Sequence, residues 1–438
     1  MQKTTFIFFV ILTGLSQIQS AEPDSLTGLG IEDILIVGNE KTGERVILRE
    51  MKSRIGTPYS ASTLDKDLDR IRSLQLFSRV QSDVFQSGPD SVTIMITVNE
   101  RWYIFPIPLL LRNEKSWKKW SFGLGVLHDN MHGLNHDLIA SGWLGFNPGF
   151  DIKYSIPWFA GSLNLYANMN IYTLKIKSQN LHTTRDGLSR YNFHEHHRGV
   201  KGYLGKRWGH HFYTSVLYAF NHLEYPDEYQ YLLPGSARSM NTISFGVSMT
   251  WDTRDLIQYP SSGCYLNASV SMTPWKDVDY SYAGTDMRAY LSWGDLTFAF
   301  RTAGKTSFGR VPVFSRTFLG YEERIRGHFT EQREGENRVL ASAEIRFPII
   351  PVRYISLRES DEILGHYSRD LPLGLNGTVF YDTGSVWMQD QAFFRSAFLT
   401  GFGIGLAARI PYAEVLRLEY ALNTDHQDEW ILDLGVAF

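Results

Sequence analysis

The sequence predicts a mainly β protein, an antiparallel transmembrane β-barrel that follows one small α/β domain. From about Trp102 to the C-terminus, apolar residues alternate with small or polar ones, as at Trp120, Phe122, Leu124 and Val126. This period of two is typical of strands that have one apolar face. The segments run roughly 9 to 13 residues, near the length that crosses a bilayer at barrel tilt. Counting them gives about sixteen strands, an even number as in bacterial single-chain barrels.

Length and composition allow a folded protein of two parts and exclude one class of partner. The chain has 438 residues, of which 43% are hydrophobic and 14% aromatic, enough for a sizeable buried surface. Its formal net charge is -3, and no cluster of Lys or Arg is interleaved with aromatic residues, so we expect no nucleic-acid partner. Cys264 is the single cysteine, so no internal disulfide can form.

The first residues have the pattern of an export signal. A positive charge at Lys3 precedes an apolar run over residues 6–15, and small residues follow up to Ala21. We therefore expect residues 1–21 to be a cleaved signal peptide and residues 22–30 to be a short N-terminal segment. A membrane anchor is the alternative, but the run is shorter than the roughly 20 residues that a spanning helix needs.

Alternation by itself does not distinguish a membrane barrel from a soluble sandwich, because the strands of a sandwich also have one apolar face. The export signal and the segment length favour the barrel. The chain also ends on an alternating strand, with apolar residues at Trp430, Leu432, Leu434, Val436 and Phe438. We therefore expect residues 102–438 to form an outer-membrane β-barrel, since only helices and closed barrels satisfy every backbone group in lipid.

Residues 31–101 are predicted to form one small α/β unit, in the order strand, helix, helix, strand, strand. Leu64, Leu68 and Ile71 recur at helical spacing, and residues 91–100 alternate like a half-buried strand. The unit resembles a POTRA domain in the segments Val37-Gly38-Asn39, Gly56-Thr57-Pro58-Tyr59 and Leu76-Phe77-Ser78-Arg79-Val80. The resemblance implies a periplasmic domain, and there is room for only one. A generic α/β domain is the alternative.

A loop motif and a strand motif stand out in the barrel segment. Residues 324–329, Arg-Ile-Arg-Gly-His-Phe, lie in a long polar run between two alternating segments. Residues 379–387, Val-Phe-Tyr-Asp-Thr-Gly-Ser-Val-Trp, resemble the strand that partners an inserted Arg-Gly loop in the BamA/TamA family of outer-membrane assembly barrels. The resemblance implies two sets of site residues, the lumenal loop residues Arg326, Gly327 and Phe329 and their strand partners Phe380, Asp382 and Gly384. The chain departs from the family at His328, because an aromatic residue usually follows Arg-Gly.

The chemistry of these residues fits an inward position. In a strand, Phe380, Asp382 and Gly384 share one face, and Val379 lies on the other. A carboxylate on the lipid face is costly, so Asp382 is expected to point into the lumen, where Arg326 of the loop can pair with it. A solvated turn is the alternative for the loop.

Strand parity predicts the side of the membrane on which each connection lies. With the α/β unit in the periplasm, the polar runs that fall outside the cell are 176–197, 223–240 and 309–338. The short connections 147–149 and 293–295 are expected in the periplasm. The connection 348–372 is long yet periplasmic by this count, which leaves open that a strand nearby is miscounted.

The first and last barrel segments are predicted to meet in a lateral seam. Proline removes a ladder donor and is tolerated in sheets mainly at edges, and glycine near the C-terminus would let the last strand bend inward. The seam residues are Pro106, Pro108, Trp430, Gly435 and Phe438. On the alternation of the terminal strand, its aromatic residues face lipid, whereas Asp433 and Gly435 face the lumen. The alternative is that residues 102–111 are only a linker.

Other chemistry is disfavoured by the sequence. A cluster of histidines raises the hypothesis of a zinc site, namely His194, His196, His197, His210 and His211. Their spacing fits no standard ligand motif, and solvated loop residues are the favoured interpretation. No nucleophile triad, P-loop or dinucleotide fingerprint has the required structural context. We expect neither an enzyme nor a metal or other cofactor.

The resemblance implies a protein of the outer membrane of a Gram-negative bacterium that inserts, assembles or translocates other polypeptides. Its partners would be unfolded outer-membrane proteins or secreted polypeptides, outer-membrane lipids, and periplasmic or lipoprotein subunits that dock on the POTRA-like domain. An exporter of two-partner secretion is one alternative, although such exporters usually carry two POTRA units and a plug helix. A passive porin or structural surface antigen is another, and it would need neither the small domain nor the Arg-Gly loop.

Overall fold

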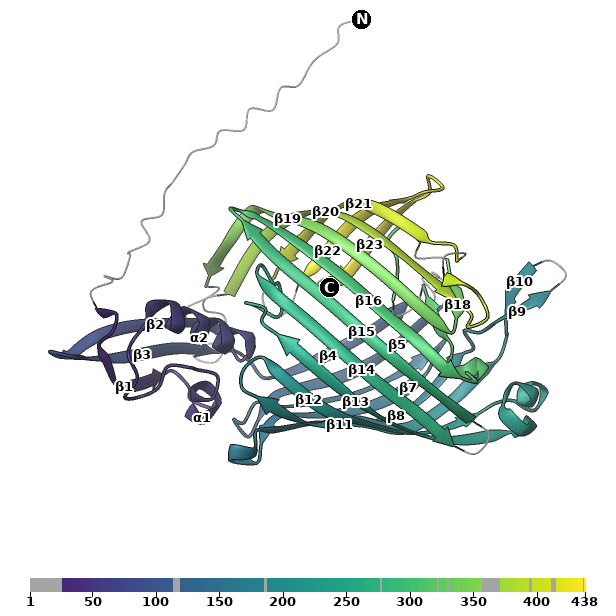
Figure 1. Ribbon diagram of the computed structural model, residues 1–438, viewed down its shortest axis with the longest axis horizontal. Coiled ribbons are helices and arrows are strands. Elements are labelled where there is room, and N and C mark those ends of the chain that lie inside the picture. Colours follow the sequence, from purple (N-terminus) through teal and green to yellow (C-terminus); the bar gives the residue numbers. More distant parts are fainter. Residues whose placement is uncertain are drawn as a thin grey trace, which may run out of the picture.

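The structure, a computed structural model, describes residues 26–112, 119–184, 187–275, 278–320, 323–328, 331–356, 371–393, 396–410, 415–435 and 437–438. These residues form a small α/β domain and one large antiparallel sheet (Figure 1). The expected signal peptide, residues 1–21, lies outside the described residues, as do Phe329 of the loop motif and Val436 of the terminal strand.

The α/β domain has the order strand, helix, helix, strand, strand, as the sequence predicts. Its elements are β1 (Gly30–Val37), α1 (Glu44–Leu48), α2 (Ala61–Ser73), β2 (Phe77–Gly88) and β3 (Ser91–Glu100). β3 lies in the middle of a three-stranded sheet, parallel to β1 and antiparallel to β2. Parallel neighbours need a crossover connection, and α1 and α2 lie within the segment that joins β1 to the rest of the sheet.

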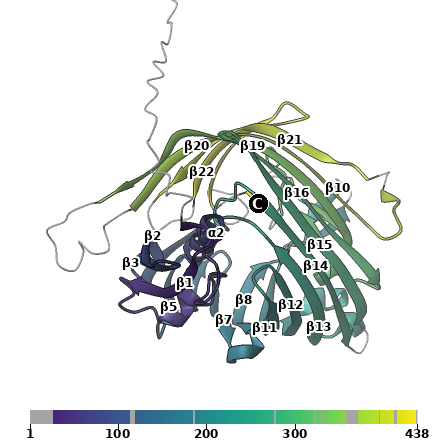
Figure 2. The same ribbon diagram turned by 60° about the vertical axis from the view of Figure 1, so that its left-hand side comes forward.

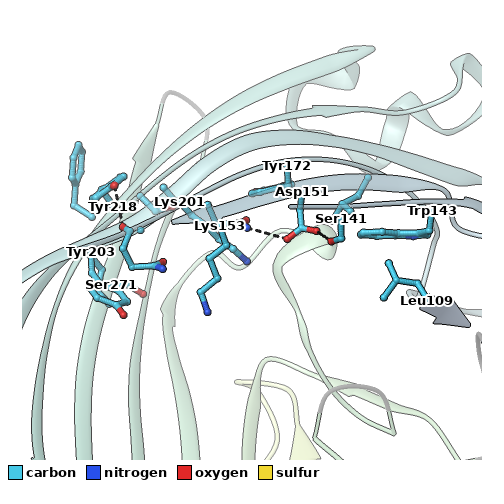
Figure 3. Close-up of a pocket in the computed structure, with 18 of the residues that line it drawn as sticks. Leu109, Ser141, Trp143, Asp151, Lys153, Tyr172, Lys201, Tyr203, Tyr218 and Ser271 are labelled. Atoms are coloured by element: carbon cyan, nitrogen blue, oxygen red, sulfur yellow. Dashed lines mark hydrogen bonds between the residues drawn. The ribbon is translucent and has the colours of Figure 1, made fainter. Parts of the chain in front are cut away.

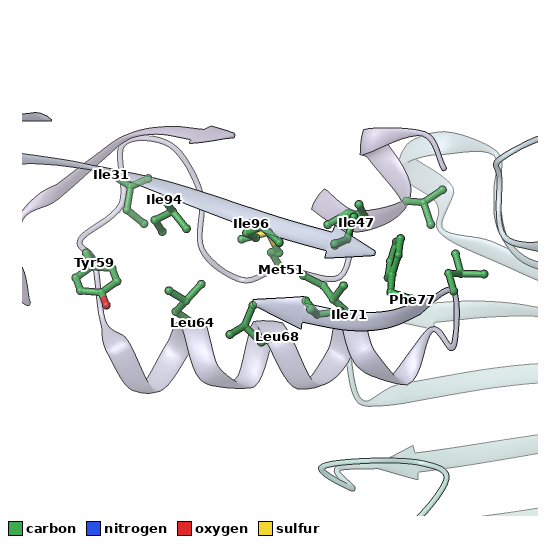
Figure 4. Packing of buried hydrophobic residues seen from close by; sticks show 14 of the residues in the cluster. Ile31, Ile47, Met51, Tyr59, Leu64, Leu68, Ile71, Phe77, Ile94 and Ile96 are labelled. Carbon is green, nitrogen blue, oxygen red and sulfur yellow. The ribbon is translucent and has the colours of Figure 1, made fainter. Parts of the chain in front are cut away.

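One face of this small sheet carries the hydrophobic core of the domain. Ile94 and Ile96 of β3 are fully buried and lie on the same side as Leu64, Leu68 and Ile71 of α2 (Figure 4). The apolar residues of α2 recur every 3.6 residues and form one stripe, and those of β3 recur every two residues and form one face. The stripe packs against the face. The α/β domain therefore has a core of its own.

The large sheet contains sixteen strands, which confirms the predicted number. They are β4 (Ile104–Arg112), β5 (Trp120–Met131), β6 (His136–Gly145), β7 (Gly149–Phe159), β8 (Leu165–Lys177), β11 (His194–Trp208), β12 (Phe212–Glu224), β13 (Ser239–Asp252), β14 (Gly263–Trp275), β15 (Val278–Trp293), β16 (Leu296–Gly309), β19 (Asn337–Ile355), β20 (Leu371–Trp387), β21 (Leu399–Arg409), β22 (Leu416–Asn423) and β23 (Asp428–Leu434).

The longer connections contain small elements of their own. Two short hairpins pair β9 (Leu181–Thr184) with β10 (Gly187–Arg190) and β17 (Thr317–Leu319) with β18 (Arg333–Gly335). The 3-10 helices are η3 (Gly161–Leu163), η4 (Asp227–Leu232), η5 (Pro234–Ser236) and η6 (Val313–Ser315). Among the described helices, none has the length and apolar character needed to cross a membrane.

The strands of the large sheet have an apolar outer face. On β20, Val379 and Tyr381 are 46% and 49% exposed, whereas Phe380 and Asp382 are only 2% exposed. On β5, Phe122 is likewise exposed on the outer face. Outward apolar residues that alternate with inward polar or small ones are the arrangement of a barrel wall in lipid.

β4 and β23 are the two edges of the sheet. The order runs from β23 to β4 through neighbouring strands, and Figure 2 shows the part of it from β11 to β16. The sequence predicts that these two strands meet. In the described residues, however, β4 pairs only with β5 and β23 only with β22.

The α/β domain lies at one end of the strands. The Gly43 N–H donates to the Gly133 carbonyl oxygen in the β5–β6 turn over 2.9 Å. The connections β8–β11, β12–β13 and β16–β19 lie at the opposite end, where Asn180 Nδ2 donates to the Val313 carbonyl oxygen over 2.7 Å. The three polar runs predicted to be outside the cell thus gather at the end away from the domain.

One short connection lies at the end opposite to the predicted one. Residues 147–149 join β6 to β7 beside the end of β8, where the Lys177 N–H donates to Asn147 Oδ1 over 2.9 Å. The prediction of a periplasmic turn is wrong here, because β4 is the first strand of the sheet and the third connection, β6–β7, therefore falls at the outer end. Residues 293–295 do lie at the domain end, since they join β15 to β16.

The connection between β19 and β20 also lies at the domain end. The guanidinium carbon of Arg79 in β2 lies 5.6 Å from the ring centre of Tyr354 in β19. Pairing of β19 with β20 continues beyond Pro348 through two register shifts. Much of the long connection is therefore extended strand, and the count of sixteen strands holds for the residues that the structure describes. Residues 357–370 lie outside the described residues.

Candidate functional site

A loop formed by residues 323–328 lies against the inner face of the sheet between β19 and β22. Glycines make room for it. A Cβ atom on Gly401 of β21 would collide with the Arg326 carbonyl oxygen, and one on Gly384 of β20 would lie 2.9 Å from Ile325 Cδ1. The small residues on these inner faces therefore admit the backbone of the loop at close range.

Arg326 makes the central contacts of the loop. Its Nε and Nη2 donate to the two carboxylate oxygens of Asp382 over 2.6 and 2.8 Å, a bidentate pair. Its Nη1 donates to Glu344 over 2.7 Å and to Glu419 over 2.9 Å. The ring centre of Phe380 lies 3.7 Å from the guanidinium carbon, so an aromatic face also contacts the cation. One loop residue thus joins β19, β20 and β22.

Two further arginines balance the charge of this group. Arg346 Nη2 lies 2.7 Å from Glu344, and Arg417 Nη1 lies 3.0 Å from Glu419. Three guanidinium groups thus meet three carboxylates, and we call them the charged cluster: Arg326, Glu344, Arg346, Asp382, Arg417 and Glu419. All six residues are buried. A buried charge that loses its partner is strongly destabilising, so the cluster depends on every member.

The charged cluster also holds the C-terminus. Arg417 Nε donates to the Gly435 carbonyl oxygen over 2.6 Å, and Arg346 Nη2 donates to that of Phe438 over 3.5 Å. Gly435 has a φ of 85°, which favours glycine, and β23 ends one residue earlier. Phe438 is buried against Tyr290. The prediction that Phe438 faces lipid is wrong, because the chain leaves the strand at Gly435 and turns inward.

Gly327 and His328 form the tip of the loop. Gly327 has a φ of 91°, and Asn423 Nδ2 donates to its carbonyl oxygen over 3.1 Å. His328 Nε2 lies 3.0 Å from the Thr400 carbonyl oxygen, and its Nδ1 lies 2.9 Å from Glu331 Oε2. The residue at which this chain departs from the family pattern is therefore a buried polar anchor between the loop and β21.

The structure places the predicted site residues in two separate regions. The loop and strand residues meet inside the sheet: Arg326, Gly327, Phe380, Asp382 and Gly384. Pro106 and Pro108 lie in the edge strand β4. Trp430 lies in the other edge strand, β23, with its side chain 66% exposed.

Sequence reasoning misses four members of the charged cluster, Glu344, Arg346, Arg417 and Glu419. A signal for them exists, because each pair is spaced two residues apart in an alternating segment with an apolar residue between. Charges at this spacing in a membrane strand share a face, and the inner face is the one that tolerates them. The sequence does not reveal that both pairs flank the same arginine.

The opposite wall of the lumen borders a hollow of about 900 Å³ (Figure 3). The Asp151 carboxylate of β7 accepts hydrogen bonds from Ser141 and, over 3.3 Å, from Asn170 Nδ2. The Lys201 ammonium of β11 lies 5.3 Å from the ring centre of Tyr172. The lining thus combines hydroxyl, amide and aromatic groups with single charges, a surface that can contact both polar and apolar parts of a ligand.

A second group of contacts joins the α/β domain to the barrel. Arg207 of β11 donates to the Glu50 carboxylate through Nη1 and Nη2 over 3.4 and 3.3 Å. Burial lowers the pKa of Arg49 to about 10, although Glu50 beside it opposes the shift. Burial also lowers the pKa of His210, in the β11–β12 turn, to about 4. The contact between the α/β domain and the barrel therefore partly shields Arg49 and His210 from water at the domain end of the lumen.

The histidines that suggest a zinc site serve other contacts. His197 Nε2 lies 2.9 Å from Glu195 Oε2, and His211 Nδ1 lies 3.0 Å from the Asp252 carbonyl oxygen. Within the part of the chain that the structure describes, no group of three or more His, Cys, Asp or Glu side chains could hold a metal ion.

These features define the class of the protein. An outer-membrane β-barrel protein with a periplasmic domain has three parts that are present here. They are a sheet of sixteen antiparallel strands with an apolar outer face, a loop on its inner face, and an α/β domain at one end. The chain belongs to the Omp85 superfamily, since the model of the Omp85 superfamily domain matches residues 130–438. The POTRA model, described as a surface antigen variable number repeat, matches residues 30–101. The barrel lies in the outer membrane and the POTRA domain in the periplasm.

Individual relatives are similar over different extents. The outer membrane protein assembly factor BamA of Neisseria meningitidis serogroup B is 33% identical over 73 residues, which are 16% of this chain and only 9% of that protein. CdiB from Escherichia coli has a similar fold, with a TM-score of 0.60 at 13% identity over 94% of this chain and 75% of that one. BamA from Haemophilus ducreyi lacking POTRA domains 1-3 matches with a TM-score of 0.49 at 19% identity, over 93% and 83% of the two chains.

Proposed function

We propose that this Omp85 protein inserts other polypeptides into the outer membrane, and that a client strand adds at the lateral seam between β4 and β23. The observation that carries the proposal is that these two strands are the edges of the sheet. A sheet edge presents unpaired backbone groups, and an extended peptide can bind there by adding a strand.

The free edge of β4 is poor in hydrogen-bond donors. The Tyr103 carbonyl oxygen accepts a bond from the Asp129 N–H over 2.8 Å, so residue 103 and every second residue after it face β5. Pro106 and Pro108 fall in the alternate row, which faces the free edge, and neither has an N–H. Closure of the seam would therefore lack two ladder bonds. The seam is expected to be the weakest pairing of the barrel and the easiest to exchange for a client strand.

The other edge is short and anchored from within. β23 has seven residues, and its Ile431 packs against Phe380 beside the charged cluster. Arg417 holds the backbone at Gly435, immediately after the strand. These contacts lie on the inner face. They support a model in which β23 keeps its position while the backbone groups on the side away from β22 stay available to a client strand.

A second candidate function is the translocation of a secreted polypeptide through the lumen. It is favoured by the hollow of about 900 Å³, whose mixed polar and aromatic lining suits an extended chain. In this case the outer connections would have to separate, because the Leu181 N–H donates to Glu334 Oε2 over 2.5 Å across the outer end.

A disulfide across the seam tests the first candidate. In a Cys264→Ser background, single cysteines at positions 105–110 of β4 are combined with single cysteines at positions 429–433 of β23. Oxidation of a pair that crosslinks is expected to stop client assembly, and reduction is expected to restore it. A matched control places cysteines at Val247 and Val270, register partners in the permanent β13–β14 ladder. Wild-type assembly with a locked seam would refute the seam proposal.

An inventory of the outer membrane after depletion separates the two candidates. A general loss of β-barrel proteins is expected for an insertase. Loss of a single secreted protein, with the other barrels unchanged, would instead assign the chain as a dedicated translocator.

A further inference from the structure

The outward faces of β8, β11, β12 and β13 change character abruptly near the extracellular end. Strand register aligns Ile171, Val200, Phe220 and Ile243 in one row across the four strands. Ile171 and Phe220 are 44% and 45% exposed, so this apolar row faces outward. It is the last row of the apolar belt before the outer connections begin.

Two polar rows follow the apolar one on the same outward face. The first contains Thr173, Arg198, His222 and Asn241, and the second contains Lys175, His196, Glu224 and Ser239. Because side chains alternate across a strand, residues two apart share a face. The residues between, such as Leu223 and Thr242, are buried on the inner side. We call the two rows the rim patch.

Cations outnumber carboxylates in the rim patch. Arg198 has a side-chain exposure of 57%, and its Nη2 lies 3.8 Å from Glu224 Oε2, the single carboxylate of the patch. His222 Nε2 also lies 3.0 Å from Glu224. Lys175 is exposed and makes no ion pair within the described part of the chain. Two cations, Lys175 and Arg198, against the one carboxylate of Glu224 give the patch a net positive charge at neutral pH.

Acidic residues approach the rim patch from one neighbouring element. Asp227 and Glu228 of η4 line a small hollow together with Lys175 and His196. Asp227 Oδ1 lies 3.5 Å from Arg238 Nε, and both side chains are exposed. Glu228 borders the second row, at Lys175 and His196, whereas the row that contains Arg198 is the nearer one to the apolar belt.

We propose that the rim patch binds a phosphorylated glycolipid of the outer leaflet. Its place directly above the apolar belt at the extracellular end suits a ligand with acyl chains below and an anionic head group above. Lys175 and Arg198 would contact phosphate, since basic residues at a membrane boundary attract anionic head groups. The amide and hydroxyl groups of Asn241 and Ser239 suit sugar hydroxyls. The bound lipid would hold the outer wall at β8–β13, away from the proposed seam.

Lipid titration of the purified full-length chain in detergent micelles tests this site. Native mass spectrometry counts bound bisphosphorylated lipid A, dephosphorylated lipid A and phosphatidylglycerol, and inorganic phosphate is tested separately by calorimetry. Bisphosphorylated lipid A is expected to bind most tightly. Replacement Arg198→Gln or Lys175→Gln is expected to weaken its binding about fivefold for each cation removed. Arg198→Lys, which keeps the charge, is expected to retain most of the affinity.

Lys206→Gln is the matched control, because Lys206 lies on the same face of β11 at the opposite end of the strand. Binding by this variant is expected to equal that of the unmodified chain. The proposal fails if Lys206→Gln and Arg198→Gln lose affinity equally, or if dephosphorylated lipid A binds as tightly as the phosphorylated form. Equal binding of phosphatidylglycerol would refute a glycolipid as the ligand, and equal binding of inorganic phosphate would refute a lipid.

Discussion

The two halves of the lumen wall differ in what covers them. Along β19–β22 the inner face is covered by the loop 323–328 and by the buried ion pairs around Arg326. Along β6–β12 the inner face borders the hollow, and polar groups such as Asp151 bond to residues of adjacent strands. Both halves have the same alternation and the same apolar outer face. Alternation therefore decides which side chains point inward, whereas the size and charge of those side chains decide what can lie against them.

Glycine is the physical origin of this difference at the loop. The inner face of β21 has Gly401 where the Arg326 backbone crosses it. The corresponding surface of β8 carries Asn170 and Tyr172, whose side chains occupy that space. A loop can approach the first surface within backbone contact but not the second, so one half is covered by the loop and the other borders an open hollow.

Replacement Arg326→Ala is expected to have the largest effect on the covered half. It leaves three buried carboxylates without their shared cation, at a cost of about 3–5 kcal/mol in the free energy of unfolding. The temperature at which the folded band disappears in heat-modifiability gels measures this loss. Arg324→Ala is the control, since Arg324 is an exposed arginine of the same loop. A double-mutant cycle with Asp382→Ala should show strong coupling, and strictly additive losses would contradict the pairing.

Substitution by arginine at two neighbouring positions of β12 compares the polarity of the outer face with that of the hollow. Val216 is 55% exposed on the outer face, whereas Leu217 lines the hollow. Val216→Arg is expected to cost about 2–4 kcal/mol near the bilayer midplane, and Leu217→Arg much less, because water reaches the hollow. The yield of folded barrel in lipid vesicles measures both. Equal damage at the two positions would show that the hollow is not open to water.

Gly401→Ala tests whether close backbone approach keeps the loop in place. The added Cβ collides with the Arg326 carbonyl oxygen, so the loop must shift, and we expect a loss of about 1–3 kcal/mol with faster proteolysis of the loop. Gly304→Ala on β16 is the matched control, because its Cβ would lie 3.6 Å from Thr285 Oγ1, an ordinary contact. If both variants are digested equally, the glycine at β21 does not determine the position of the loop.

The smallest effect is expected in the open half. Asp151→Asn keeps the size of the side chain and weakens hydrogen bonds to Ser141 and Asn170, for a loss of about 1 kcal/mol or less. Asp382→Asn, the same change in the covered half, is expected to cost at least twice as much because it removes a buried counterion of Arg326. Chemical denaturation of both variants in the same detergent compares them. A larger loss for Asp151→Asn would contradict the greater dependence of the covered half on its buried charges.

The sequence by itself determined the class of fold, the number of strands and the faces of β20. These follow from local rules, since a period of two assigns the faces of a strand and an aspartate in a membrane strand must point inward. The resemblance of the loop motif and the strand motif to the BamA/TamA family also identified both ends of the Arg326–Asp382 pair, and the charge of Asp382 agrees with it because a carboxylate requires a partner away from lipid.

Only the tertiary structure decided the remaining contacts. Glu344 and Glu419 meet the same arginine because the sheet curls and brings β19 and β22 around one loop, a relation that no local spacing encodes. The position of residues 147–149 at the end away from the α/β domain followed from the order of the strands. The burial of Phe438 depended on a positive φ at Gly435 and on the arginines that bind the last carbonyl groups. Alternation constrains a strand only while the strand continues, so the contacts of its ends and of the loops that cross it are decided by the elements that pack against them.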